Sequence, residues 1–144
     1  MRDPDLYGDD AVVDRLLRDT AVWVVAGLSQ HEERAAYGVA RLLQSRGKRI
    51  VPVHPRAQEV HGEQGYSTVQ DAAFAVGPID VVDCFVNSRR VGEVVDAAIA
   101  VGAKAVWLQL DVVDEDAARR ARDAGLDVVM DRCPAIEYRR GLGA

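Results

Sequence analysis

Five predominantly apolar strand segments, separated by segments with helical periodicity, constrain the fold of this chain more than any other feature. These strand segments occupy residues 21–27, 48–55, 79–86, 102–110 and 125–131. Continuous apolar strands are typical of parallel sheets that are buried on both faces, and helices supply the crossovers that parallel strands need. We therefore expect an α/β fold, a three-layer Rossmann-like sandwich with a five-stranded, mainly parallel sheet.

The expected strand order is 3-2-1-4-5, with strands numbered along the chain, as in many Rossmann-like sheets. The 144 residues fit a single domain, in which residues 1–19 form an N-terminal lead-in and a helix. Such sheets bind ligands outside the carboxyl ends of their strands, where the strand order reverses. Functional residues are therefore expected in the loops that follow the strands.

Charge and composition exclude several classes of function. The net charge is −5 and the pI is about 5.1, which argues against binding to nucleic acid or to anionic membranes. No apolar run reaches the roughly 20 residues of a membrane helix, and the acidic residues 1–10 do not resemble a signal peptide. Cys84 and Cys133 are too few for a disulfide framework. We expect a cytoplasmic protein.

The turn after the first strand has features of a phosphate site but departs from the dinucleotide fingerprint. Only Gly27 remains at the strand end, where G-x-G-x-x-G has three glycines. Amides at the start of the following helix attract phosphate, and Ser29 and Arg34 can add a hydroxyl and a guanidinium group. A plain strand-to-helix loop fits the same pattern.

The end of the second strand argues against NAD. NAD-binding folds carry an acidic residue about 20 residues after the glycines, which accepts hydrogen bonds from the ribose hydroxyls. This chain has His54, Pro55 and Arg56 there, and the next acid is Glu59. Such a strand end tolerates a phosphorylated ribose, which NADP and coenzyme A (CoA) both carry.

Four sequence blocks in a fixed order are similar to the CoA-binding domain family. They are GLS with the following YGVARLLQSRGKRIVPVHP, then DVVDCFVNS, GAKAVWLQLDVV and GLDVVMDRCPAIEY. The resemblance implies a Rossmann-like fold that binds CoA where the strand order reverses. Similar sequences occur as small free-standing CoA-binding proteins and as the N-terminal domain of the succinyl-CoA synthetase α subunit.

The resemblance also implies a set of binding residues at four strand ends. The first strand would hold phosphate, the second would flank adenosine, and the third and fourth would line the rest of the ligand. These residues are Gly27, Leu28, Ser29, Arg34, Val53, His54, Pro55, Arg56, Phe85, Val86, Asn87 and Gln109. Two positions depart from the family pattern: His54 replaces a frequent asparagine, and Val86-Asn87 replaces a frequent arginine, which removes a charge near the ligand.

The preferred interpretation is a module that binds CoA or acyl-CoA without a catalytic centre. No GxSxG elbow, HExxH helix or Walker-type loop occurs, and the histidines are not spaced for a metal site. A sensor, a carrier, a homodimer or an accessory subunit of an acyl-CoA enzyme fits this interpretation. The alternatives are an NADP- or acyl-CoA-dependent enzyme that uses Cys133, Asp131 or His54, and an interaction protein without a ligand.

Cys133 allows two interpretations. Beside Arg132, its thiolate could exchange with the thiol of CoA. A half-buried structural cysteine in a strand-to-helix turn is the simpler role, and the sequence favours it. Arg132 and Glu137 are spaced to form an ion pair that holds the C-terminal helix, and Cys84 is expected in the core.

Overall fold

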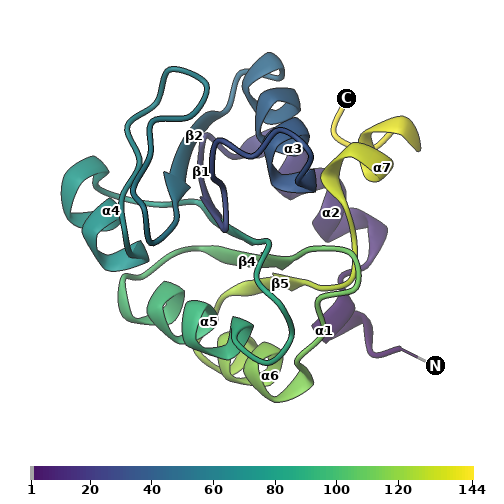
Figure 1. Ribbon diagram of the computed structural model, residues 1–144. Helices are drawn as coiled ribbons and strands as arrows, with labels where there is room; N and C mark the ends of the chain where they lie inside the picture. The colour runs from purple at the N-terminus through teal and green to yellow at the C-terminus, as the bar shows by residue number, and fades with distance from the viewer. Residues whose placement is uncertain (1) are drawn as a thin grey trace.

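The computed structural model describes residues 2–144 as a five-stranded parallel sheet between two layers of helices (Figure 1). The strands are β1 (Val22–Ala26), β2 (Arg49–Val53), β3 (Val81–Cys84), β4 (Ala105–Leu108) and β5 (Asp127–Val129). The helices are α1 (Pro4–Tyr7), α2 (Asp10–Asp19), α3 (Ala35–Ser45), α4 (Val69–Val76), α5 (Val91–Ala100), α6 (Glu115–Asp123) and α7 (Pro134–Arg139). The expected Rossmann-like α/β class is confirmed.

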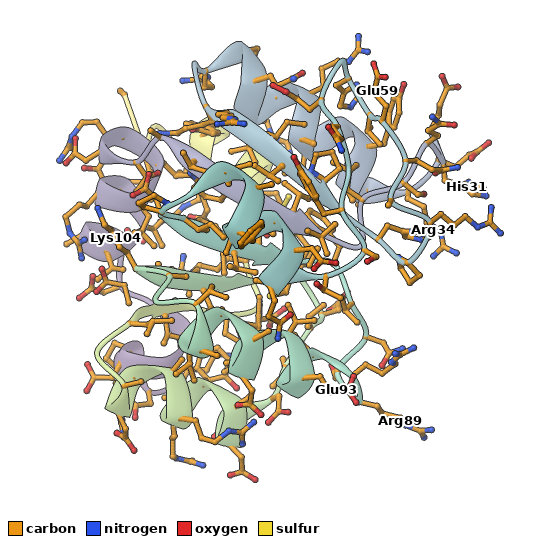
Figure 2. All side chains as sticks on the ribbon, turned by 90° about the vertical axis from the view of Figure 1, so that its left-hand side faces the viewer. His31, Arg34, Glu59, Arg89, Glu93 and Lys104 are labelled. Carbon is orange, nitrogen blue, oxygen red and sulfur yellow. The ribbon has the colours of Figure 1, made fainter. Side chains whose placement is uncertain are left out.

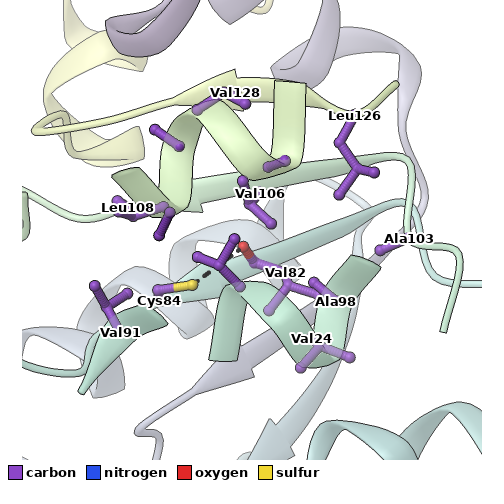
Figure 3. Packing of buried hydrophobic residues seen from close by; sticks show 14 of the residues in the cluster. Val24, Val82, Cys84, Val91, Ala98, Ala103, Val106, Leu108, Leu126 and Val128 are labelled. Carbon is purple, nitrogen blue, oxygen red and sulfur yellow. Dashed lines mark hydrogen bonds between the residues drawn. The ribbon is translucent and has the colours of Figure 1, made fainter. Parts of the chain in front are cut away.

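Successive side chains of each strand enter two separate hydrophobic cores. The α5 face of the sheet is covered by α1, α4, α5 and α6, and it receives Val24, Val82 and Val106 (Figure 3). The α3 face is covered by α2, α3 and α7, and it receives Trp23 and Trp107, whose ring centroids lie 5.7 Å apart. Because both faces are buried, the strands need no polar side, which explains why most of their residues are apolar.

The expected strand order is wrong, because the sheet has the order β2-β1-β3-β4-β5. β1 pairs with both β2 and β3, whereas β2 pairs with β1 alone and therefore lies at the edge of the sheet. Pro52 gives the physical reason. It has no N–H to donate to a second neighbour, and its carbonyl oxygen faces outward and accepts from the Tyr66 amide at 2.9 Å. Proline is confined to edge positions of sheets, so β3 takes the inner place beside β1.

Within the N-terminal lead-in, Pro4–Tyr7 form α1, which packs against β5 and α6. Leu6 and Tyr7 are buried, and the Tyr7 hydroxyl donates to Glu115 at 2.8 Å. The Arg132 guanidinium donates to the carbonyl oxygens of Tyr7 at 3.3 Å and Gly8 at 2.8 Å. This segment therefore holds the carboxyl end of β5 in place.

The end of β1 requires glycine. Gly27 has a φ of +97°, and a Cβ at this position would lie 2.7 Å from the carbonyl oxygen of Phe85, just after β3. The Gly27 amide donates to the Val53 carbonyl oxygen at 2.8 Å. The chain therefore leaves β1 between the ends of β2 and β3, with no room for a side chain.

Replacing Gly27 with alanine should lower the free energy of unfolding by about 2–4 kcal/mol, because left-handed strain and a backbone clash act together. Gly47→Ala is the matched control, since Gly47 has a φ of +86° but no atom within 4 Å of the added Cβ. It should cost about 1–2 kcal/mol from the φ angle alone. Urea unfolding measures both variants, and equal losses would contradict the close approach of Phe85.

β3 carries a buried carboxyl group on the α3 face. Asp83 is fully buried, and neither of its carboxylate oxygens has a hydrogen-bond partner in residues 2–144. Its neighbours on the adjacent strands are Val25 and Trp107. Burial raises the pKa of Asp83 well above its usual range, because a charge costs more in an apolar interior than a neutral acid does.

The folded protein should therefore lose stability as pH rises from the unfolded-state pKa of Asp83 to its higher folded-state pKa. The loss amounts to about 1.4 kcal/mol for each pH unit between the two values. Asp83→Asn removes this dependence, so its stability relative to the wild type should increase with pH. Urea unfolding across a pH series measures the difference, and parallel curves would contradict a neutral Asp83.

Asp80→Asn is a control with the opposite sign. Burial opposes ionisation of Asp80, but hydrogen bonds from the Val22 and Ala21 amides and the nearby Lys104 outweigh it and lower the Asp80 pKa. Its stabilisation is present above the unfolded-state pKa and is lost as pH falls. Asp80→Asn should therefore have a lower free energy of unfolding than the wild type near neutral pH, and this difference should shrink toward acid pH.

Candidate functional site

Loops from three neighbouring strands meet at the carboxyl edge of the sheet. Figure 2 shows Arg34, Glu59 and Arg89 extending from this edge, with Lys104 at the opposite edge. Arg34 follows β1, Glu59 follows β2 and Arg89 follows β3. The structure therefore brings together the loops in which the sequence predicts binding residues.

The turn after β1 presents two unpaired backbone amides. Beyond Gly27, Leu28 is buried and Ser29 is half-buried. Within the described part of the chain, the N–H groups of Leu28 and Ser29 have no hydrogen-bond acceptor. Successive free amides in a turn form a concave site for an anion.

The first turn of α3 adds further donors. Its N-cap residue, Arg34, makes no side-chain capping bond. The Tyr37 amide donates to the Arg34 carbonyl oxygen at 3.1 Å, so within residues 2–144 the amides of Ala35 and Ala36 are left to solvent or to a ligand. The Arg34 side chain is exposed and has no ion-pair partner among residues 2–144. The Ser29 hydroxyl oxygen accepts from the His31 amide at 3.2 Å, and its hydrogen remains able to donate.

The end of β2 offers a neutral imidazole and no carboxylate. His54 is half-buried, and its Nδ1 lies 3.2 Å from the Arg56 amide that donates to it. Burial, and then the positive charge of Arg56, lowers the pKa of His54. The ring hydrogen is assigned to Nε2 because Nδ1 accepts. Val53 is buried, whereas Pro55 and Arg56 are exposed.

The end of β3 supplies an apolar floor and two arginines that the sequence reasoning missed. Phe85 and Val86 are half-buried. The Asn87 side-chain oxygen accepts from the amides of Arg89 at 3.0 Å and Arg90 at 3.2 Å, which fixes the turn before α5. The charge expected to be missing at Val86-Asn87 therefore reappears two to four residues later at the same edge. The adjacent arginines were a visible signal in the sequence.

Gln109 lies at the end of β4 on the α3 face. Only 6% of its surface is exposed, and its side-chain oxygen Oε1 has no hydrogen-bond partner among the described residues. An unpaired buried acceptor costs about 1–3 kcal/mol. Gln109 follows β4, which β3 separates from β1 and Gly27.

A second missed feature joins the loops after β1 and β2. The Gln58 side-chain oxygen accepts from the Gln30 amide at 3.1 Å, and the Gln30 side chain donates to the Glu59 carbonyl oxygen at 2.9 Å. His61 holds the same loop to α3, with its Nε2 2.8 Å from the Tyr37 carbonyl oxygen. These contacts depend on loop conformation, so sequence periodicity gives no signal for them.

The remaining acidic, histidine and cysteine side chains do not gather into a metal-binding group in the described part of the chain, where no three of them are placed to hold a metal ion. His31 pairs with Glu33, Nδ1 to Oε2 at 2.7 Å, and both are exposed. In that same part of the chain, no helix is long and apolar enough to cross a membrane.

Comparison with known proteins identifies relatives over nearly the whole chain. The chain is 29% identical over 128 residues to the uncharacterized protein YneT of Bacillus subtilis (strain 168), which covers 89% of this chain and 93% of YneT. The structure of this chain is similar to that of a hypothetical protein from Pyrococcus horikoshii OT3, with a TM-score of 0.83 and 35% identity. The match covers 97% of this chain and 96% of the P. horikoshii protein.

The same fold occurs within a larger enzyme. The dinucleotide-forming acetyl-coenzyme A synthetase 1 of Ca. Korarchaeum cryptofilum matches with a TM-score of 0.68 and 25% identity, over 83% of this chain but 28% of the synthetase. The family model described as the CoA binding domain matches residues 21–139. This chain belongs to the CoA-binding domain family.

Proposed function

We propose that this protein binds CoA or acyl-CoA at the carboxyl edge of the sheet, without a catalytic centre of its own. The observation that carries the proposal is the pair of unpaired amides at Leu28 and Ser29, directly behind Gly27. Two rigid N–H donors beside the first turn of α3 suit a pyrophosphate. Arg34 and Arg89 add positive charge at the same edge of the sheet (Figure 2).

The end of β2 supports a ligand with a phosphorylated ribose. The segment from Val53 to Arg56 contains no carboxylate that would accept from free ribose hydroxyls. The neutral His54 ring can donate from Nε2, and the Arg56 guanidinium can pair with a phosphate. This combination favours CoA over NAD.

The rest of the edge supports binding of an extended arm. Phe85 and Val86 offer partly exposed apolar surface, and the unpaired Gln109 oxygen can accept from an amide N–H. The arm of CoA contains two amide groups between apolar segments. In this role the protein would present or withhold CoA for an acyl-CoA enzyme, as an accessory module or a sensor.

Ligand-dependent thermal unfolding tests the proposal with CoA, acetyl-CoA, NAD, NADP and ATP. A ligand at 100 times its Kd adds about 2.7 kcal/mol to the free energy of unfolding, which corresponds to roughly 5–10 °C in Tm for a chain of this size. We expect shifts with CoA and acetyl-CoA only. A shift with NADP alone would favour a dehydrogenase-like enzyme, and no shift with any ligand would favour an interaction protein; either result overturns the proposal.

Arg34→Ala and Arg89→Ala should each weaken CoA binding roughly 3- to 10-fold, the effect of losing one solvent-exposed charge contact of about 1 kcal/mol. The loss should shrink as salt is added, because exposed charges are screened. Isothermal calorimetry measures the affinities.

Arg49→Ala is the matched control, since Arg49 is also exposed but lies at the amino end of β2. It removes the same charge from the opposite edge of the sheet and should leave the affinity unchanged. If Arg49→Ala weakened binding as much as Arg34→Ala, the ligand would not lie at the carboxyl edge.

A further inference from the structure

A second group of side chains lies on the α3 face beyond the turn after β1. The Gln109 amide donates to the Cys84 carbonyl oxygen at 3.2 Å, which continues the β3–β4 pairing and sets Gln109 beside Phe85. Side chains two residues apart on a strand share a face, so Gln109 lies on the same face as Trp107. Phe85 and Cys133 are both partly buried against the hydrophobic core of that face.

Cys133 is held in a defined position at the end of β5. The Trp107 indole donates from Nε1 to the carbonyl oxygen of Arg132 at 2.9 Å, which fixes the connection from β5 to α7. The predicted ion pair between Arg132 and Glu137 is present, Nη1 to Oε2 at 3.3 Å. Cys133 is a free cysteine of intermediate exposure, packed against the rim of the core on the α3 face.

The unpaired side-chain oxygen of Gln109 is evidence for a ligand in this region. Gln109 is more than nine-tenths buried on the face that Phe85 and Cys133 share, and its Oε1 lacks a partner. A ligand that donates an N–H here would remove the cost of the unpaired acceptor. Both amides of the CoA arm carry such a group, and the thiol lies at the end of that arm.

The span of the site fits this path. From β1 to β5 the sheet crosses three strand spacings, through β3 and β4, or about 15 Å. A phosphate at the turn after β1 and a thiol near the end of β5 would place the arm over Phe85 and Gln109. The end of the arm then lies beside Cys133.

We propose that Cys133 is a modification site that forms a mixed disulfide with the thiol end of bound CoA, an inference that rests on the proposed CoA binding. The co-reactant is an oxidised form of the ligand, CoA disulfide. The Cys133 thiolate attacks one sulfur of the CoA disulfide, a new S–S bond forms between Cys133 and that CoA, and the second CoA leaves as its thiolate. The reaction is reversed by excess free thiol.

Cys84 provides an internal comparison. It is fully buried on the opposite face of the sheet, and its thiol donates to the Val82 carbonyl oxygen at 3.7 Å (Figure 3). Burial, together with the nearby Asp83, raises its pKa well above the ordinary range. Cys84 therefore remains a buried thiol and should not exchange.

Intact-mass spectrometry of the protein incubated with CoA disulfide tests the inference. We expect one CoA adduct per chain, reversed by dithiothreitol and mapped to Cys133 by peptide analysis. Cys133→Ser should form no adduct, and circular dichroism checks that this variant is folded. An adduct on Cys84, or none on the wild type, would overturn the inference.

Glutathione disulfide separates delivery by a bound ligand from simple exposure of the thiol. We expect CoA disulfide to modify Cys133 at least tenfold faster than glutathione disulfide at equal concentration, and Gln109→Leu to reduce this preference. Equal rates would mean that binding does not deliver the thiol, and the inference would fail. Calorimetry of reduced CoA with the wild type, run in parallel, shows whether the proposed function has failed as well.

Discussion

The close approach of the Phe85 carbonyl oxygen to Gly27 is the contact on which the carboxyl edge depends. It exists because β1 lies between β2 and β3, so that the chain must leave β1 through the gap between two neighbouring strand ends. Only a residue without a Cβ and with a positive φ fits there. The same turn leaves the Leu28 and Ser29 amides unpaired within residues 2–144, so a packing constraint and the proposed anion site share one backbone conformation.

The chemistry of the proposed site is divided among the strands. The ends of β1 and β3 contribute amides and arginines, the end of β2 contributes a neutral His54 without a carboxylate, and the end of β4 contributes the unpaired oxygen of Gln109. These groups match phosphate, a phosphorylated ribose and an amide-containing arm. In the proposed function, all of these groups together would contact CoA.

Much of the fold could be predicted from the sequence, because predominantly apolar segments and helical spacing are local signals. The strand order could not be obtained from this periodicity, since it depends on which strands become neighbours. Pro52 was the one residue that carried this information, through its missing N–H. At the site, Gly27 and Arg34 follow from the strand end, whereas the Gln30–Gln58 contacts and the position of Arg89 depend on loop conformations that spacing does not encode.

The most direct test of this account is a titration of isotope-labelled protein with CoA, followed through the backbone amide resonances. We expect the largest chemical-shift changes at the Leu28 and Ser29 amides and in the first turn of α3, with smaller changes at the ends of β2, β3 and β4. Changes confined to the amino edge of the sheet, around Arg49 and Lys104, would contradict it, as would a spectrum that CoA does not alter.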